Sequence, residues 1–402
     1  MKIIFINRYF YPDQSATSQL LTDLAFDLSQ DKNIHIITSS QRYDDPKQKL
    51  PPFEIKNSIQ IHRLWTTRFG RQRLLGRAVD YLSFYFSAAW RLWRLTSKAD
   101  VVIAKTDPPF ISVVAAVIVK LRGATLINWL QDVYPEIATS LGVVGMRRGP
   151  LLSILQWLRN RSLRSALTNV VLGHLMAKRL EQLGIASSKI RIIPNWVDGD
   201  HIQPIAKANN PLTEKWGLSK QFVVGYSGNM GRAHEFATIL EAAEKLIEDK
   251  QIIFLFIGDG PMRTWIKHEV QKRSLTNVMF RPYQPREELS NSLTVPDVHL
   301  ISLRSDLEGL IVPSKFYGIA AAGRATLYIG DKAGEIPRIL DSNNCGLTIS
   351  EQDSDDLANH IKRLANNPQS CQEMGNNARD IFEKLYNKPI AFGLWRQVLD
   401  IR

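Results

Sequence analysis

Hydrophobic and polar positions along the chain follow two different periods. Short apolar runs rich in β-branched residues, such as Ile34–Thr38, indicate strands, and apolar residues three and four apart, as in Gln19–Ser29, indicate amphipathic helices. The strands expected in the first half are Lys2–Asn7, Ile34–Thr38, Ile59–Leu64, Val101–Lys105, Thr125–Trp129, Asn169–Leu172 and Ile190–Pro194. The helices expected there are Gln19–Ser29, Leu74–Thr96, Phe110–Leu121, Leu151–Ser165 and Met176–Leu183.

The second half repeats this alternation. Its expected strands are Phe222–Ser227, Ile252–Ile257, Val278–Arg281, Val298–Leu303 and Ala325–Ile329. Its expected helices are Glu235–Glu248, Met262–Arg273, Glu287–Leu293, Phe316–Ala322 and Ala391–Leu399. Repeated strand-helix units predict parallel sheets with helices on both faces, and ligands of such sheets bind at the carboxyl ends of the strands. The pattern therefore predicts an α/β protein with two doubly wound, Rossmann-like domains.

The expected domain boundaries follow from composition. Residues 1–197 form a first domain, and 198–213, which are rich in Pro, Asn and Asp, form a linker. Residues 214–388 form a second domain, and the last helix, within 389–402, is expected to fold back toward the first domain.

The net positive charge of the chain lies entirely in its first half. Residues 1–200 carry 27 lysines and arginines against 15 acidic residues, whereas 201–402 carry 24 of each. The surplus is concentrated in Lys56–Arg94, where eight basic residues alternate with aromatic ones around a single acid, and in Arg147–Arg179, which has seven basic residues and no acid. Such a distribution predicts that the two domains have different partners.

Cysteine content and hydropathy indicate an intracellular protein. Two cysteines, Cys345 and Cys371, provide no disulfide framework. The apolar start at Met1–Ile6 is too short for a signal peptide and is expected to be the first strand. No apolar run reaches the roughly 18–20 residues of a membrane span. We expect a cytoplasmic protein that is peripheral at the inner face of the plasma membrane.

Candidate chemistry is densest in residues 306–323. Glu308 and Gly309 are expected to lie at the end of the strand Val298–Leu303, and Pro313-Ser314-Lys315 then opens a helix that ends at Gly323. A helix start at the carboxyl end of a parallel sheet presents unpaired N–H groups to an anion, and Lys315 adds a positive charge. Glu308 supplies an acceptor for a sugar hydroxyl. The alternative is an ordinary strand-loop-helix connection.

An ordered set of motifs extends over nearly the whole chain. Its members are Asn7–Pro12, Ile193-Pro194-Asn195, Gly225–Gly231, Phe256–Pro261, Asn277–Leu289, Asp297–Leu303, Glu308-Gly309-Leu310 and Ala321–Gly323. In this order they resemble the retaining glycosyltransferases of family 4, which have the two-domain GT-B architecture. Two further segments, Lys105–Pro109 and Asn128–Glu136, resemble the branch that transfers fucose or N-acetylfucosamine in colanic-acid and O-antigen synthesis.

The resemblance implies a reaction and its substrates. The second domain would hold a nucleotide-diphosphate sugar, which is UDP- or GDP-linked. The two domains would face each other across a cleft. The first domain would hold a lipid-linked or saccharide acceptor, with a polyprenyl diphosphate as the expected carrier. The reaction would need neither a metal nor another cofactor. The product would belong to bacterial surface polysaccharide synthesis.

Three departures from the family pattern affect the expected site. The family's Arg and Lys in the second-domain loop, which face the donor diphosphate, are Asn229 and His234 here, so Arg232 and Lys315 are the expected replacements. The family's ribose-binding Glu is Gly318. The family's His-Asp pair in the first domain is Gln131-Asp132, so Asp132 alone is expected to make the acceptor or sugar contact.

The resemblance thus implies the following site. The candidate catalytic residues are Asp132, Arg232 and Glu308. The candidate donor-binding residues are Gln14, Ser15, Gly228, Asn229, Arg232, His234, Tyr283, Glu308, Gly309, Leu310, Ser314 and Lys315. Gly258-Asp259-Gly260-Pro261 is expected to be a turn without ligand contact. The isolated histidines have no metal-ligand spacing, and no metal site is assigned.

Two other function classes compete with glycosyl transfer. A nucleotide-sugar epimerase can use a similar two-domain fold, but the spacing of the motifs favours a transferase. A nucleic-acid-binding protein would explain the basic first half and its interleaved aromatic residues. No nucleic-acid-binding motif appears, however, and the second half would be unexplained. No nucleic-acid partner is expected.

The long helix expected at Leu74–Thr96 predicts a membrane contact. Its apolar residues recur at helical spacing and are Leu75, Ala78, Val79, Leu82, Tyr85, Phe86, Ala89 and Trp93. Basic residues flank this stripe: Arg73, Arg77, Arg91 and Arg94. Such a helix can lie in the headgroup layer of an anionic membrane with its aromatic face down. The alternative is that the stripe packs on the sheet of the first domain.

Overall fold

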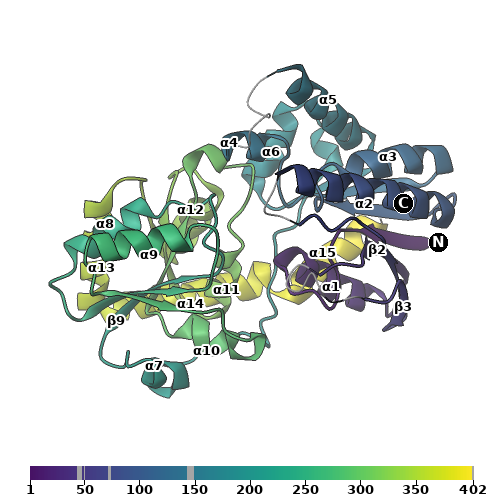
Figure 1. The fold of residues 1–402 in the computed structure, drawn as a ribbon. Helices are drawn as coiled ribbons and strands as arrows, with labels where there is room; N and C mark the ends of the chain where they lie inside the picture. Colours follow the sequence, from purple (N-terminus) through teal and green to yellow (C-terminus); the bar gives the residue numbers. More distant parts are fainter. Residues whose placement is uncertain (43–47, 49, 71–73, 143–148, 401–402) are drawn as a thin grey trace. The chain divides into compact units, whose positions relative to one another are not determined.

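The computed structural model describes residues 1–42, 48, 50–70, 74–142 and 149–400, and these form two compact units (Figure 1). Unit 1 consists of Met1–Ile193 with Leu394–Arg402, and unit 2 of Pro194–Gly393. Each unit is built on a sheet whose strands are parallel, with one antiparallel exception in unit 1. The predicted α/β class with two doubly wound domains is confirmed.

Among the described residues, the sheet of unit 1 has eight strands in the order β3-β4-β2-β1-β5-β6-β7-β8. Their bounds are β1 Lys2–Ile6, β2 Asn33–Ser39, β3 Phe53–Lys56, β4 Ile59–Leu64, β5 Val101–Lys105, β6 Thr125–Trp129, β7 Thr168–Val171 and β8 Ile190–Ile192. β3 pairs antiparallel with β4 at the edge. The chain builds outward from β1 through β2 to β4 and then crosses to β5 on the other side. The switch point of the sheet therefore lies between β1 and β5.

Helices cover both faces of this sheet. They are α1 Ala16–Leu28, α2 Leu74–Leu95, α3 Ile111–Arg122, α4 Glu136–Ser140, α5 Pro150–Ser165 and α6 His174–Gln182, with a short 3₁₀ turn at Ser187–Lys189. α2, α3 and α5 lie side by side over one face (Figure 1). The buried apolar side chains of α2 and α3, among them Phe84, Leu92 and Ile111, pack against the strands and form the core on this side.

The sheet of unit 2 has the order β11-β10-β9-β12-β13-β14, with all pairs parallel. The strands are β9 Phe222–Ser227, β10 Ile252–Ile257, β11 Val278–Arg281, β12 Val298–Ser302, β13 Ala325–Ile329 and β14 Gly346–Ile349. The helices are α7 Pro211–Lys215, α8 Ala237–Lys245, α9 Arg263–Lys272, α10 Leu289–Thr294, α11 Lys315–Ala321, α12 Glu335–Asn343, α13 Ser354–Asn366 and α14 Pro368–Ile381. Here the switch point lies between β9 and β12.

Short 3₁₀ turns and one π-helical turn complete unit 2. The 3₁₀ turns are Lys207–Asn209, Arg286–Glu288 and Ser305–Leu307, and the π-helical turn is Phe382–Tyr386. The turn at Ser305–Leu307 separates β12 from Glu308, so the expectation that Glu308 lies directly at the end of a strand is wrong.

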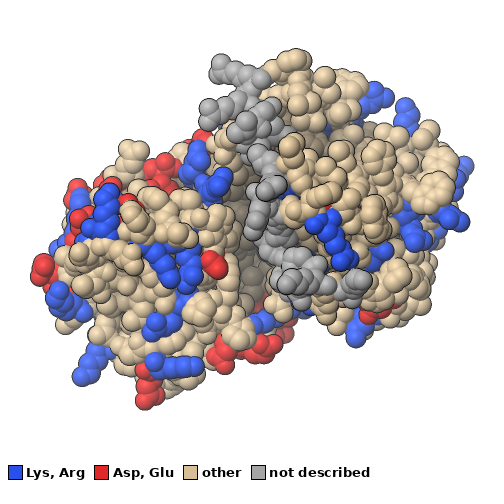
Figure 2. All heavy atoms as spheres, in the orientation of Figure 1, with Lys and Arg blue, Asp and Glu red and all other residues tan. Residues whose placement is uncertain are grey.

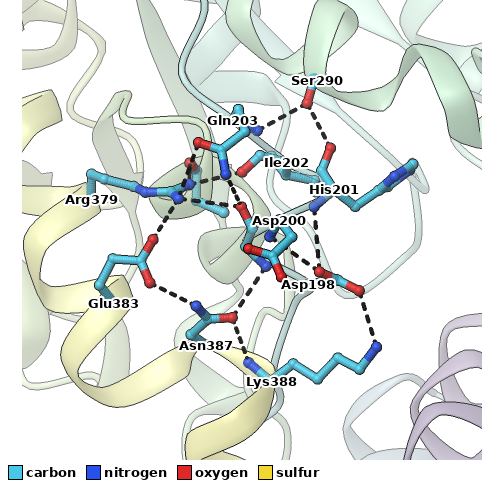
Figure 3. Close-up of polar contacts among 12 residues, drawn as sticks. Asp198, Asp200, His201, Ile202, Gln203, Ser290, Arg379, Glu383, Asn387 and Lys388 are labelled. Carbon is cyan, nitrogen blue, oxygen red and sulfur yellow. Dashed lines mark hydrogen bonds and ion pairs between the residues drawn. The ribbon is translucent and has the colours of Figure 1, made fainter.

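The structure places the expected linker, 198–213, within unit 2 (Figure 3). Arg379 of α14 donates a hydrogen bond to the backbone oxygen of Gly199 at 3.2 Å, and the ammonium of Lys388 lies 3.0 Å from the carboxylate of Asp198. These contacts bind the segment to the C-terminal helices of the same unit. It is therefore a packed part of unit 2.

The last helix, α15 (Lys388–Asp400), contributes to both units, and from Leu394 onward it belongs to unit 1. Its Trp395 packs edge-on against Trp129 of β6, with ring centroids 4.7 Å apart. Arg396 binds the carboxylate of Asp27 on α1 at 2.8 Å. A buried aromatic pair and a charged hydrogen bond therefore fix the end of the chain to unit 1.

Candidate functional site

Two glycine-rich loops of unit 2 touch each other at the carboxyl ends of adjacent strands. The loop 228–232 follows β9 and the loop 258–261 follows β10. Gly258 has a φ of +127°, and a Cβ there would lie 2.3 Å from the backbone oxygen of Gly228. A Cβ on Gly260 would lie 2.6 Å from the side-chain oxygen of Asn229. The segment 258–261 therefore packs directly against the loop 228–232, and this contact leaves no room for side chains at Gly258 and Gly260.

The first loop presents backbone donors. The N–H of Gly228 is occupied by the carbonyl of Ile257 at 2.9 Å. The N–H groups of Asn229, Gly231 and Arg232 donate to no acceptor in the part of the chain that the structure describes. Neighbouring unpaired N–H groups at a strand end form a concave site that suits phosphate oxygens.

Lys315, the first residue of α11, extends toward this loop. Its Nζ donates hydrogen bonds to the hydroxyl of Tyr226 and to the backbone oxygen of Asn229, the latter at 3.1 Å. The ammonium also lies 3.7 Å from the centroid of the Tyr226 ring. Burial lowers the pKa of Lys315 well below its usual value because it disfavours the charged form. A phosphate at the loop would offset this effect by favouring the ammonium.

Both ring nitrogens of His234 have a hydrogen-bonding partner. Its Nδ1 lies 2.5 Å from the backbone oxygen of Ser302 and therefore carries the proton, so the lone pair of Nε2 faces the Lys315 ammonium at 3.4 Å. Burial, together with the charge of Lys315, lowers the pKa of His234 to about 3. The imidazole is consequently neutral near pH 7. It positions Lys315 and adds no charge of its own.

The remaining polar candidates around the loop are more exposed to solvent. Arg232 and Ser314 are exposed, and Arg232 forms no ion pair or hydrogen bond with any residue that the structure describes. Tyr283 follows β11, is 54% exposed, and its hydroxyl lies 3.5 Å from the backbone oxygen of Asp259. The structure therefore brings Arg232, Lys315 and Tyr283 to the same edge of the sheet.

Glu308 lies on the β13 side of β12. Its carboxylate accepts a hydrogen bond from the hydroxyl of Tyr328 on β13 and a long one, 3.4 Å, from the backbone N–H of Glu335 at the start of α12. Burial raises the pKa of Glu308, and the bond from Tyr328 opposes that rise. Oε1 is also close to Gly334, where an added Cβ would lie 2.4 Å away. These contacts hold the carboxylate in one orientation.

The two residues after Glu308 differ in whether their backbone N–H groups are already hydrogen-bonded. The N–H of Leu310 donates to the backbone oxygen of Leu307 at 3.0 Å and is therefore already paired within the loop. The N–H of Gly309 makes no backbone bond with the described residues and stays a candidate. A Cβ on Gly318 would lie 3.5 Å from Leu293, so the site of the missing ribose-binding carboxylate is bordered by an apolar side chain.

Three candidates belong to unit 1. Gln14 is exposed, and Ser15, the residue before α1, donates its N–H to Asp13 at 2.8 Å while its buried hydroxyl has no partner among the described residues. Asp132 follows β6. Burial, with a smaller contribution from the charge of Asp107, raises its pKa to about 7. A carboxylate with such a pKa can accept a proton near neutral pH.

Several residues around these candidates were missed from the sequence. Tyr226 and Tyr328 orient Lys315 and Glu308, and Asp107 influences Asp132. Each lies within two residues of the carboxyl end of a predicted strand, so the rule that ligands bind at carboxyl ends of parallel strands would have pointed to them. The described residues contain no cluster of His, Cys, Asp or Glu suited to a metal ion.

Unit 1 also has an apolar outer face on α2, α3 and α5. The inward side of α2 is buried, but most of the stripe identified from the sequence faces outward. The exposed large apolar side chains of α2 are Leu75, Val79, Leu82, Phe86, Trp90 and Trp93. The same face includes Val117 and Leu121 of α3 and Leu151, Ile154 and Trp157 of α5. In Figure 2 the region of these helices is mostly tan with blue near its outer edge. Arg71 and Arg73 lie outside the described residues.

Two family models match the chain. Residues 31–196 match the model described as glycosyl transferase 4-like domain, and residues 210–381 match glycosyl transferases group 1. The two ranges correspond closely to the two units. No helix among the described residues is both long and apolar enough to cross a membrane.

Similar proteins support the same assignment. The chain is 25% identical over 324 residues to the probable glycosyltransferase WbjE of Pseudomonas aeruginosa, covering 81% of this chain and 80% of that protein. It is 26% identical over 264 residues to the putative colanic acid biosynthesis glycosyl transferase WcaI of Escherichia coli, covering 65% and 63%. The structure of Anabaena HepE in complex with UDP-glucose superposes with a TM-score of 0.73 at 15% identity, covering all of both chains.

Proposed function

The chain belongs to the glycosyltransferases of family 4 and has the GT-B architecture, and on this basis we propose that it transfers a sugar from a UDP- or GDP-sugar to a lipid-linked acceptor with retention of anomeric configuration. The name of WcaI, a putative colanic acid biosynthesis glycosyl transferase, favours a role in bacterial surface polysaccharide synthesis. Fucose or N-acetylfucosamine is the sugar that the resemblance of residues 105–109 and 128–136 implies. The same comparisons favour a transferase over the epimerase.

The N–H groups of Asn229, Gly231 and Arg232, which have no acceptor among the described residues, and the Lys315 ammonium beside them are the observation that carries the proposal. The N–H groups of the loop would bind the oxygens of the donor diphosphate, and Lys315 and Arg232 would balance its charge. Negative charge accumulates on the diphosphate as the glycosidic bond breaks, so fixed cations there stabilise the transition state more than the ground state. This arrangement would not require a metal.

Glu308 is placed to act on the sugar side of the donor. A retaining transfer passes through an oxocarbenium-like state, which an oriented carboxylate stabilises. The bonds from Tyr328 and Glu335 fix the orientation of Glu308 and leave the second lone pair of each oxygen for a sugar hydroxyl. Gly309 contributes an unpaired N–H beside it.

The acceptor belongs to unit 1 in this proposal. Asp132, with its raised pKa, would accept a hydrogen bond from the attacking hydroxyl. The outward apolar face of α2, α3 and α5 supports a membrane-bound acceptor, because exposed aromatic side chains flanked by cations suit the headgroup layer of anionic lipids. Two of these cations lie over tryptophan rings: Arg122 over Trp93 and Arg161 over Trp157. The proposed location is the surface of an anionic membrane.

A donor panel tests the proposal. Calorimetry with UDP and GDP should give binding to one of them, and incubation with the matching nucleotide sugars and prenyl-diphosphate-linked sugars should give a glycosylated lipid by mass spectrometry. Arg232→Ala should weaken nucleotide binding by about 1.5–3 kcal/mol, the range for a charge-assisted contact. Arg363→Ala, an exposed arginine on α13, is the control and should bind normally. Absence of binding to any nucleoside diphosphate would overturn the proposed function.

A further inference from the structure

Arg8 is buried, and its guanidinium makes no hydrogen bond with the residues that the structure describes. It is 4% exposed, its Nε is buried without a partner, and its guanidinium donates to none of the described residues. The closest carboxylate oxygen, on Asp80, lies 3.9 Å from its Nη2. That carboxylate is already bound by the hydroxyl of Thr67 at 2.7 Å and by the N–H groups of Phe69 and Gly70 at 3.0 and 3.1 Å. A buried charge that is this poorly paired is costly unless a ligand completes it.

The position of Arg8 is where a ligand of unit 1 would bind. Arg8 follows β1 closely, and its backbone N–H donates to the carbonyl of Asp107, which follows β5, at 2.6 Å. These two loops meet at the switch point of the sheet, between β1 and β5. In open parallel sheets ligands bind in the crevice at this point.

A second arginine shares the location. The Cζ of Arg8 lies 5.0 Å from the centroid of the Tyr81 ring, and the Cζ of Arg77 lies 5.3 Å from the same centroid. Arg77 donates its Nε to the Tyr81 hydroxyl at 2.8 Å and forms no ion pair with the residues that the structure describes. Two guanidiniums on one ring present a combined set of N–H donors, and planar guanidinium groups match phosphate oxygens.

Two acidic residues of unit 1, Asp107 and Asp132, would bind a part of the ligand that is not anionic. The charges of Asp107 and Asp132 act on the phenols of Tyr81 and Tyr134, as do those of the two arginines. Carboxylates beside a purely anionic ligand would repel it, but they suit hydroxyl groups that donate hydrogen bonds. The complementary ligand therefore carries both an anionic group and hydroxyl groups. A sugar joined to a diphosphate has this chemistry.

We propose that Arg8 and Arg77 bind the diphosphate of the lipid-linked acceptor, leaving Asp132 to contact a hydroxyl of the sugar attached to it. The inference rests on the proposed function, which supplies an acceptor on a prenyl diphosphate. α2 connects the two parts of such a ligand, because Arg77 and Tyr81 face the switch point while their neighbours Leu82 and Phe86 are exposed on the apolar face.

Binding of geranyl diphosphate, a soluble prenyl diphosphate, tests this assignment by calorimetry on the full chain. The wild type should bind geranyl diphosphate more tightly than inorganic diphosphate, since the prenyl chain adds apolar contact. Arg8→Met should weaken this binding roughly ten- to a hundredfold and leave UDP or GDP binding unchanged. Its melting temperature without ligand should equal or exceed that of the wild type, because the Arg8 guanidinium donates no hydrogen bond to the described residues.

Arg63→Met is the matched control. Arg63 is equally buried, at 3% exposed, but it is bonded to Glu54 at 2.7 Å and to the backbone oxygen of Tyr11 at 3.0 Å. Its replacement should lower the melting temperature and leave the affinity of the folded protein for geranyl diphosphate unchanged. Arg8→Lys, which keeps a charge but not the planar group, should bind with intermediate affinity.

Several outcomes would overturn the inference. One is that Arg8→Met binds geranyl diphosphate as tightly as the wild type does. Another is that Arg8→Met loses affinity for UDP or GDP together with its affinity for geranyl diphosphate. A third is that Arg8→Met is destabilised as much as Arg63→Met is. Failure of the wild type to prefer geranyl diphosphate over inorganic diphosphate would do the same. In each case intact nucleotide binding by the wild type would leave the proposed glycosyl transfer standing, so the two failures are distinguishable.

Discussion

Replacement of Glu308 by Gln separates a catalytic role of this carboxylate from a structural one. The amide oxygen of Gln can still accept the hydrogen bond from Tyr328, so the structural loss is the difference between a charge-assisted and a neutral bond. That difference is about 1 kcal/mol. The second contact, 3.4 Å from the N–H of Glu335, is too long to add much.

The expected catalytic loss is larger. A fixed negative charge beside an oxocarbenium-like state contributes most in the transition state, and removing one such group typically costs about 2.7 kcal/mol or more, which is roughly 10² in rate. We therefore expect Glu308→Gln to reduce kcat by roughly a hundredfold with little change in KM for the donor, and to lower the free energy of unfolding by only about 1 kcal/mol.

The assay combines steady-state transfer kinetics with urea unfolding. Tyr328→Phe is the control, since it removes the hydrogen bond but keeps the carboxylate and its charge. It should lower stability by about 1 kcal/mol and reduce transfer by less than tenfold. Wild-type turnover in a folded Glu308→Gln variant would show that the carboxylate only joins its loop to β13 and α12, and the assignment of Glu308 to the sugar would be refuted.

Four other changes have defined outcomes. Lys315→Met should weaken nucleotide binding by about 1.5–3 kcal/mol in calorimetry, whereas Arg363→Met should not; equal affinities would remove the lysine from the donor site. The pKa of about 7 at Asp132 predicts that kcat/KM rises with pH up to about 7 as the carboxylate ionises, and Asp132→Asn should abolish this limb; an unchanged profile in that variant would contradict it. Burial lowers the pKa of His62 to about 4, so the unfolded chain binds more protons between pH 6.5 and 4, and stability should fall by about 3 kcal/mol as the pH is lowered through that window; urea unfolding of His62→Phe should show a smaller fall. Phe86→Asp should reduce co-sedimentation with anionic vesicles at low salt without changing UDP or GDP binding; undiminished co-sedimentation would exclude this face as the membrane contact.

The strands could be predicted from the sequence because they are buried on both faces. Continuous apolar runs such as Val101–Lys105 and Ile252–Ile257 leave no other arrangement, and both have the predicted bounds. β3 (Phe53–Lys56) was missed, since it is a short, mostly exposed edge strand whose alternating residues are a weak signal. β14 and the helices α12, α13 and α14 were also not assigned, although α13 has a strongly amphipathic pattern.

The site could be predicted only in part. The motifs identified the loops and the residues on them, because glycines at strand ends and a lysine at a helix start carry local signals. The bonds among Lys315, Tyr226 and His234 were not predictable, since they join segments about 80 residues apart in sequence. The burial of Arg8 was hidden for the same reason: it depends on the packing of α2 over the switch point.

The anomeric configuration of the product tests the central claim most directly. The nucleotide sugar that the chain accepts would be incubated with a prenyl-diphosphate-linked acceptor, and the anomeric proton coupling of the new linkage would be measured by nuclear magnetic resonance. The proposed mechanism predicts the same anomeric configuration in the product as in the donor. A product of inverted configuration, or no transfer by protein that binds the donor, would contradict it.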